Sequence, residues 1–295
     1  MNTALKPRKI EQKKKNHALV IVTIFFLVFL AFFVYNLIEL FTWWNDGRLA
    51  HRNTATMHEI FSDHMAGISE LSAQIVLDPT PLPQAQPQQP PLELAAANPT
   101  FSFNGPSPLD IARSHTGNDD IIAYIFIEGT NINNVVLQTN DNDFYLHHDM
   151  YGNPNSNGAL FMDFRNHGNF QDPNTIIYGH NMRNGSMFHN IRYFMEPDFF
   201  HDHPNIMVIA DDRVFIYQIF TSFSTRVDFD YIQVFFNDRA EFYGLIQELQ
   251  HRAMFPTQHV ISQYDHILIL STCTNVHVDS RYVVAGVLRS VMYIE

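Results

Sequence analysis

The pattern of apolar and polar residues divides the chain into stretches of different character. Residues 18–38 form an unbroken uncharged run, and residues 78–91 are rich in proline and glutamine. Between them, residues 49–77 carry apolar side chains at helical spacing and predict one or two helices. We therefore expect a basic tail (1–17), a transmembrane helix (18–38), a juxtamembrane helical segment (39–77), a linker (78–108) and a globular domain (109–295).

The stretch from residue 109 onward predicts a mainly β domain. Turn residues separate many of its short runs of Ile, Val, Phe and Tyr, and one amphipathic helix interrupts them over 238–254. This pattern favours an antiparallel barrel or sandwich over a doubly wound α/β fold. The predicted strands are 121–127, 135–138, 159–163, 175–178, 206–210, 214–223, 267–270 and 282–288.

The uncharged run predicts a single membrane anchor. Its 21 residues span roughly 31 Å as a helix at ~1.5 Å per residue, which matches the hydrocarbon core of a bilayer. Residues 1–17 hold six basic residues against one acidic residue, which predicts a cytoplasmic N-terminus and an extracytoplasmic domain. The alternative is a cleaved signal peptide, but its apolar region usually has only ~7–15 residues, whereas this run continues into Trp43 and Trp44.

Charge and cysteine content exclude several classes of protein. The net charge is −12, and beyond Lys15 there is no lysine and 12 arginines face 29 acidic residues, which argues against a nucleic-acid partner. A single cysteine excludes an intramolecular disulfide framework and a Cys-rich metal site. The proline–glutamine tract predicts an extended spacer, because proline removes amide donors and favours polyproline II.

Cys273 is the candidate nucleophile. It follows the apolar run 267–270, where a buried strand emerges. A lone cysteine is often a small buried hydrophobe, but in an exported protein an unpaired thiol is open to oxidation. A thiol nucleophile needs a base or cation nearby, because only the thiolate attacks. His180, after the strand 175–178, and Arg281, at the start of the strand 282–288, are the candidate partners.

These residues stand in segments that resemble the class B sortases. The segment Ile177-Tyr178-Gly179-His180-Asn181-Met182 resembles their histidine block. Leu270-Ser271-Thr272-Cys273, followed by Asp279-Ser280-Arg281-Tyr282, resembles their cysteine and arginine block. Two upstream segments, 127–132 and 141–149, are similar as well. The resemblance covers the chain from about Leu109 to its end, with the motifs in the family's order.

The resemblance implies a sortase β-barrel of about eight strands with N-terminal helices and one inserted helix. It also implies a cysteine transpeptidase that cleaves a C-terminal sorting motif after threonine through a thioacyl enzyme. Cys273 would be the nucleophile, His180 the general acid and then base, and Arg281 the support for the oxyanion. The implied partners are surface proteins with a sorting signal, an amine of a peptidoglycan precursor and the cell membrane; no cofactor is implied.

The groove for the sorting motif is carried over from the same segments. The implied substrate-binding residues are Asn142, Leu146, Tyr178, Tyr231, Ile232 and Ser271. Val227 departs from the pattern, because some class B members have threonine there, and this puts one hydrogen bond to substrate in doubt. The proline–glutamine tract is a second departure.

Other chemistries fit the sequence less well. His147-His148-Asp149 and His201-Asp202-His203 suggest a metal, but neighbouring strand residues point to opposite faces and further ligands are not evident. Asp141-Asn142-Asp143 begins like a calcium loop but lacks its glycine and glutamate, so we expect a turn with capping side chains. Two alternatives stay open: an inactive membrane-tethered binding or assembly module, and a sortase that polymerises pilins.

Overall fold

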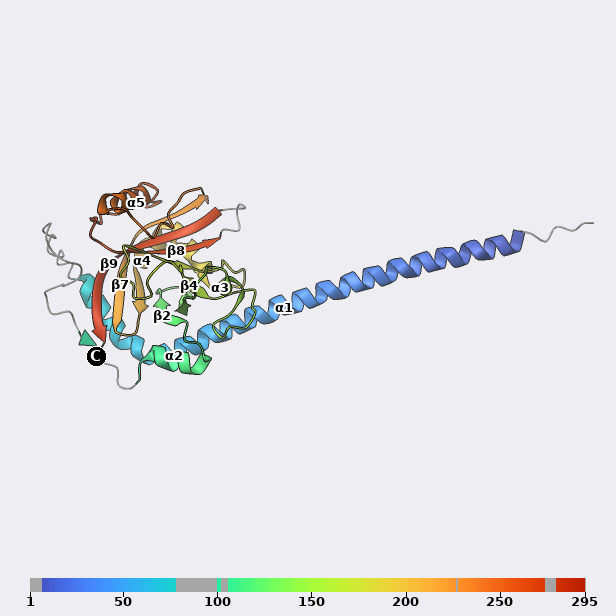
Figure 1. The fold of residues 1–295 in the computed structure, drawn as a ribbon, viewed down its shortest axis with the longest axis horizontal. Helices are drawn as coiled ribbons and strands as arrows, with labels where there is room; N and C mark the ends of the chain where they lie inside the picture. The colour runs from blue at the N-terminus through green and yellow to red at the C-terminus, as the bar shows by residue number, and fades with distance from the viewer. Residues whose placement is uncertain (1–6, 78–99, 102–105, 227, 274–279, 295) are drawn as a thin grey trace, which may run out of the picture. The chain divides into compact units, whose positions relative to one another are not determined.

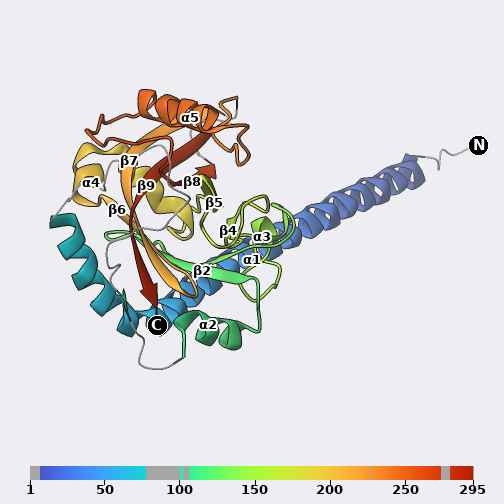
Figure 2. The ribbon, with the colours of Figure 1, turned by 60° about the vertical axis from the view of Figure 1, so that its left-hand side comes forward.

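The computed structural model describes residues 7–77, 100–101, 106–226, 228–273 and 280–294, with the backbone alone for 7–18, 63–77, 100–101 and 273. The chain forms two compact units, Met1–Arg48 and Leu49–Glu295. The second unit contains the β-structure (Figures 1 and 2). Most of the linker expected over 78–108, and Val227, lie outside the described residues.

Eight strands close into a barrel, as the resemblance implied. Around the barrel the order is β9-β7-β6-β2-β3-β4-β5-β8, and β8 pairs back with β9. A ninth strand, β1 (Thr100–Phe101), adds in parallel to the end of β9 and falls inside the expected linker. The barrel strands are β2 (Ile121–Phe126), β3 (Asn133–Leu137), β4 (Leu160–Met162), β5 (Asn174–Tyr178), β6 (Asn205–Ile209), β7 (Arg213–Arg226), β8 (Ile267–Cys273) and β9 (Ser280–Ile294).

The expectation of an antiparallel sheet is wrong at two places in the barrel. β3 pairs with β4 in parallel, and so does β5 with β8. Parallel neighbours need a crossover that returns the chain to the same end. The β3–β4 connection contains α3 (Phe144–His147), and the longer β5–β8 connection contains the 3-10 helix η1 (Phe188–Met195), α4 (Pro197–Asp202), two strands and α5 (Arg239–His251). The sequence pattern did not predict η1, α3 or α4, which are too short for a clear helical period.

Strand alternation sorts the apolar residues into the barrel interior and two covered outer faces. In β8, Leu268 and Leu270 belong to the interior core, whereas Ile267 and Ile269 pack with α5. The expected inserted helix is therefore confirmed. Asp238 caps it by accepting a hydrogen bond from the Glu241 amide at 2.9 Å, and its apolar face is buried: Phe242, Leu245, Ile246 and Leu249.

The other outer face is covered by α2 (Pro108–Thr116) and by part of α1 (Pro7–Leu77). Met57 and Phe61 of α1 are fully buried together with Leu109 of α2. The Phe61 ring stacks on Tyr124 of β2 with 3.9 Å between ring centroids. In both views α2 and α5 lie on opposite sides of the barrel (Figures 1 and 2). Residues 49–62 therefore contribute to the core of the same unit as the barrel.

The part of α1 from Leu19 to Ser62 is long and apolar enough, by length and composition, to cross a membrane. The apolar side chains from Leu19 to Trp44 are exposed. By length and composition this agrees with the expected anchor. The division into tail, anchor, helical segment, linker and catalytic domain stays a prediction.

Candidate active site

Strand register brings the three candidate catalytic positions to one end of the barrel. In the parallel pair of β5 and β8, Tyr178 is the partner of Ser271. His180 follows Tyr178 by two residues, and Cys273 follows Ser271 by two. In the antiparallel pair of β8 and β9, Cys273 is the Cα partner of Arg281. The backbone therefore gathers His180, just after β5, with Cys273 of β8 and Arg281 of β9.

The loop that carries His180 is fixed by close packing and by hydrogen bonds. A Cβ on Gly179 would collide with the side chains of Leu160 and Phe188, so a larger residue before the histidine would displace them. The Phe188 amide donates to the His180 carbonyl at 2.9 Å, and the His189 Nδ1 is 3.0 Å from Asn181 Oδ1. These contacts hold the backbone of the turn after β5, which carries the His180 side chain.

The imidazole of His180 is half-buried and touches the predicted groove. Its Nε2 lies 2.8 Å from the carbonyl oxygen of Leu146. A carbonyl only accepts, so we infer that Nε2 carries the proton and that Nδ1 is the basic nitrogen of the neutral ring. Leu146, one of the predicted groove residues, thus meets the candidate acid–base through its backbone.

Arg281 has most of its guanidinium donors uncommitted within the described residues. The side chain is half-buried, and its one hydrogen bond there runs from Nη1 to the Ser280 carbonyl at 3.0 Å. None of the ion pairs in the described part of the chain includes Arg281. A guanidinium in this state can bind a substrate carbonyl or a developing negative charge.

A buried carboxylate lies beside the candidate site, and the sequence analysis did not single it out. Asp163 directly follows β4, and its side chain is 0% exposed. Its Oδ2 accepts from the Tyr178 hydroxyl at 2.9 Å, Asn142 Nδ2 at 3.1 Å and Arg165 Nη2 at 2.7 Å. Its Oδ1 accepts from the Arg165 amide at 3.0 Å and Nε at 2.8 Å.

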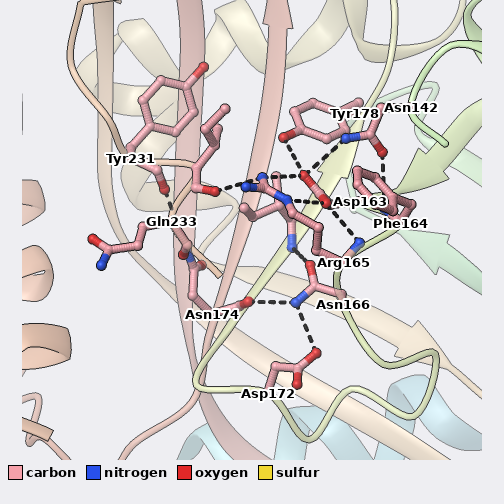
Figure 3. Close-up of polar contacts among 12 residues, drawn as sticks. Asn142, Asp163, Phe164, Arg165, Asn166, Asp172, Asn174, Tyr178, Tyr231 and Gln233 are labelled. Atoms are coloured by element: carbon pink, nitrogen blue, oxygen red, sulfur yellow. Dashed lines mark hydrogen bonds and ion pairs between the residues drawn. The ribbon is translucent and has the colours of Figure 1, made fainter. Parts of the chain in front are cut away.

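Arg165 extends this cluster to a second segment of the groove. Its Nη2 also donates to the Ile232 carbonyl at 2.9 Å. Figure 3 shows Asn142 and Tyr178 converging on Asp163, with Arg165 between that carboxylate and the segment of Tyr231 and Gln233. We call Asn142, Asp163, Arg165, Tyr178 and the Ile232 carbonyl the Asp163 network.

Burial and neighbouring charges shift the pKa of Asp163 in opposite directions. Burial raises the pKa of Asp163, but the hydrogen bonds and charge of Arg165 and the Tyr178 hydroxyl outweigh it, so the pKa lies below its ordinary value. Burial and the neighbouring carboxylate raise the pKa of Tyr178. Asp163 is therefore ionised and Tyr178 keeps its proton at neutral pH.

The remaining predicted groove residues also have specific partners. The Tyr231 hydroxyl lies 2.8 Å from the Ser271 hydroxyl, and both side chains are buried. Asn174 Nδ2 donates to the Gln233 carbonyl at 2.9 Å and the Tyr231 carbonyl at 3.3 Å, which fixes the backbone on either side of Ile232. All six predicted groove residues thus contact the Asp163 network, His180 or each other.

The sequence contains one signal for Asp163 and Arg165, which the sequence analysis did not single out. Asp163-Phe164-Arg165 stands where the predicted strand 159–163 ends. An acid and a base two residues apart at a strand end can pair with each other, but the pattern does not say that groove residues surround them.

The polar motifs that suggested a metal have other partners. Asp141 Oδ1 accepts from the amides of Asp143 and Phe144, each at 2.8 Å, which confirms a turn with a capping side chain. His148 Nδ1 lies 2.8 Å from the Phe144 carbonyl, and the His203 ring lies against Phe199. Among the described residues, no three histidine, cysteine or acidic side chains form a metal-binding group.

Comparison with known proteins now gives the family. The model of the sortase domain matches residues 125–289, more than half of the chain, so this chain belongs to the sortase family. Among curated proteins, sortase B of Listeria monocytogenes is 36% identical over 156 residues, which cover 53% of this chain and 63% of that protein. Sortase B of Staphylococcus aureus is 28% identical over 160 residues, 54% of this chain and 66% of that protein.

Solved structures agree with the class. Sortase B from Listeria monocytogenes has a TM-score of 0.56 and 34% identity, and the match covers 60% of this chain and 99% of that chain. A Staphylococcus aureus sortase B–substrate complex has a TM-score of 0.58 and 26% identity, with coverage of 62% and 85%. The class B resemblance is confirmed, although the match spans a little under two thirds of the two curated relatives.

Proposed function

We propose that this chain is a cysteine transpeptidase that cleaves a C-terminal sorting motif after threonine and transfers the acyl group to an amine of a peptidoglycan precursor. The observation that carries the proposal is the register of β5, β8 and β9, which gathers positions 180, 273 and 281 at one barrel end. Family membership supports it, as does a relative solved as a sortase B–substrate complex.

The proposed chemistry divides between three side chains. His180 takes the proton of the Cys273 thiol, and the resulting thiolate attacks the threonine carbonyl; the peptide nitrogen then leaves with that proton from the imidazolium, which gives a thioacyl enzyme. His180 then takes a proton from the incoming amine, which attacks the thioester and releases Cys273. Arg281 stabilises the oxyanion of both tetrahedral intermediates, because its donors are uncommitted in the described part of the site.

We place the substrate in the groove formed by Asn142, Leu146, Tyr178, Tyr231, Ile232 and Ser271. Their contacts support this assignment, since the described hydrogen bonds join four of them to His180 or within the Asp163 network, and join Tyr231 to Ser271. The surface protein would be the acyl donor and the wall precursor the acceptor.

We further propose that the first unit anchors the enzyme in the cell membrane, with its N-terminus in the cytoplasm. The exposed apolar face from Leu19 to Trp44 and the basic flank support this topology. Protease added to wall-stripped cells should digest the chain after about Trp44 and leave the tail with its anchor. Protection of the barrel would reverse the proposed orientation.

Product analysis tests the reaction and separates it from the alternatives. The full-length protein in detergent is incubated with a panel of threonine-containing sorting peptides and candidate amines, and the products are identified by mass spectrometry. We expect cleavage after threonine and an amide to the acceptor. An inactive module would give no product with any peptide, and a pilin polymerase would prefer a pilin lysine to the wall amine.

A further inference from the structure

We propose that the Asp163–Arg165 ion pair is a positioning unit that orients two segments of the predicted groove for an extended peptide. This inference rests on the proposed function and adds two residues to it. Asp163 acts through Asn142 and Tyr178, and Arg165 acts through the Ile232 carbonyl.

Position 163 requires a side chain that only accepts hydrogen bonds. The Asp163 carboxylate accepts all five of its hydrogen bonds: from the Arg165 amide, Nε and Nη2, the Tyr178 hydroxyl and Asn142 Nδ2. Only an ionised carboxylate offers two acceptor oxygens and no donor. An asparagine would point an amide N–H at one or more of these donors, with nearly the same shape.

The carboxylate thereby sets which polar atoms Asn142 and Tyr178 offer to a ligand. Asn142 Nδ2 donates one hydrogen to Asp163, while its Oδ1 accepts from the Phe164 amide at 2.9 Å. Its amide orientation is therefore fixed, and the second N–H remains as a donor among the described contacts. Tyr178 gives its proton to the same carboxylate oxygen, so its hydroxyl oxygen can only accept.

The Asn142 N–H and the Tyr178 hydroxyl oxygen, both held by Asp163 Oδ2, are a donor and an acceptor side by side. Such a pair matches the backbone of an extended peptide. A peptide in that conformation offers a C=O and an N–H in alternation along its edge. The Asn142 N–H would receive the carbonyl, and the Tyr178 oxygen would receive the amide. These two contacts would involve only main-chain groups of the peptide, so they would contribute affinity for an extended backbone and leave side-chain specificity to other residues.

Arg165 joins Asp163, and with it Asn142 and Tyr178, to the 231–233 segment. It donates to both carboxylate oxygens and to the Ile232 carbonyl, which only a forked guanidinium can do in this geometry. Loss of the Arg165 guanidinium would remove the hydrogen bond to the Ile232 carbonyl, while Asn174 would still bind the carbonyls of Tyr231 and Gln233. The 231–233 segment is then expected to move more.

The test compares Asp163→Asn and Arg165→Lys with a matched control, Asp172→Asn, in the full-length protein in detergent. Asp172 is a neighbouring carboxylate that accepts from Asn166 and His167 and from no groove residue in the described structure (Figure 3). For the best-cleaved peptide of the panel, we expect Asp163→Asn and Arg165→Lys to raise KM about tenfold, the loss of roughly one charged hydrogen bond, with kcat within about twofold.

A second readout does not depend on activity. Hydrogen–deuterium exchange of the 231–233 amides should be faster in both variants and unchanged in Asp172→Asn. Tyr178→Phe added to Asp163→Asn should raise KM little further, because the two act through one hydrogen bond. If Asp163→Asn does not fold, Arg165→Lys alone decides.

The outcomes separate the two proposals. Unchanged KM and exchange in the variants, or equal changes in Asp172→Asn, would overturn the positioning role. A wild-type protein that cleaves no peptide would overturn the proposed function, and the exchange measurement would still decide whether the ion pair orders the 231–233 segment.

Discussion

Two arginines of the candidate site, Arg165 and Arg281, differ in what their guanidinium groups bind. Arg165 forms a fork with Asp163 and donates to Ile232, whereas Arg281 has a single bond to the neighbouring Ser280 carbonyl among the described contacts. A guanidinium already paired with a carboxylate gains little from a substrate, while one with free donors gains most when negative charge develops. Arg165 is thus suited to fix geometry, and Arg281 to stabilise a transition state.

The largest difference between the two arginines should appear in the kinetics of their lysine variants. Arg281→Lys should lower kcat/KM for the sorting peptide by roughly 100-fold, because a point charge does not reproduce the two-pronged contact with an oxyanion. The loss should be mainly in kcat, in contrast to the KM effect of Arg165→Lys. Steady-state kinetics of both variants checks this, and an Arg281→Lys enzyme altered mainly in KM would remove the distinction.

The free energy of unfolding should depend more on the Asp163–Arg165 pair than on Arg281. Asp163→Asn should lower the free energy of unfolding by about 3 kcal/mol at neutral pH, because it leaves the half-buried Arg165 without its counterion. Arg281→Lys should cost less than about 1 kcal/mol, since no described ion pair is lost. Urea denaturation of the two variants measures the difference. Equal losses would mean that Arg281 is also a structural residue.

The contribution of Asp163 should depend on pH. Its pKa in the folded state lies below the ordinary value of 3.8, because of Arg165 and Tyr178. The stabilisation is therefore complete above about pH 5 and is lost as the pH falls through the folded-state pKa. Urea denaturation at pH 7 and pH 3 should show that the difference in free energy of unfolding between wild type and Asp163→Asn is smaller at pH 3. A difference that stayed constant would show that the carboxylate charge contributes nothing.

The smallest effect is expected at a third arginine, which pairs with aspartate on the surface. Arg113 Nη1 and Nη2 contact Asp211 at 2.7 and 3.1 Å, a fork like that of Arg165, but the Asp211 side chain is 60% exposed. Asp211→Asn should cost about 0.5 kcal/mol, since exposed pairs contribute little. A loss as large as that of Asp163→Asn would mean that burial is not what distinguishes the two forks.

Local sequence patterns predicted the elements of this fold better than their arrangement. The eight runs of β-forming residues and the 238–254 helix all correspond to observed elements, because side-chain periodicity is a local property. The parallel pairing of β5 with β8 depends on a long crossover, and no residue within either strand encodes it. Resemblance to a family supplied the barrel that periodicity left open.

The candidate site shows the same division. Cys273, His180 and Arg281 could be found because their chemistry and family motifs are visible in the sequence. Asp163 was missed because its importance lies in five donors that come from three residues far apart along the chain. Its neighbours Asn142 and Tyr178 were predicted, but nothing in the sequence says that they bind the same oxygen.

The central claim is that Cys273 forms a thioacyl intermediate, and intact-mass analysis tests it most directly. Because the chain has one cysteine, an adduct on a thiol can lie at one position only. Wild-type protein mixed with a cleavable sorting peptide and no amine should gain the mass of the acyl fragment and lose it on treatment with hydroxylamine. Cys273→Ala should gain no adduct and cleave nothing, and an adduct or wild-type cleavage in that variant would contradict the account.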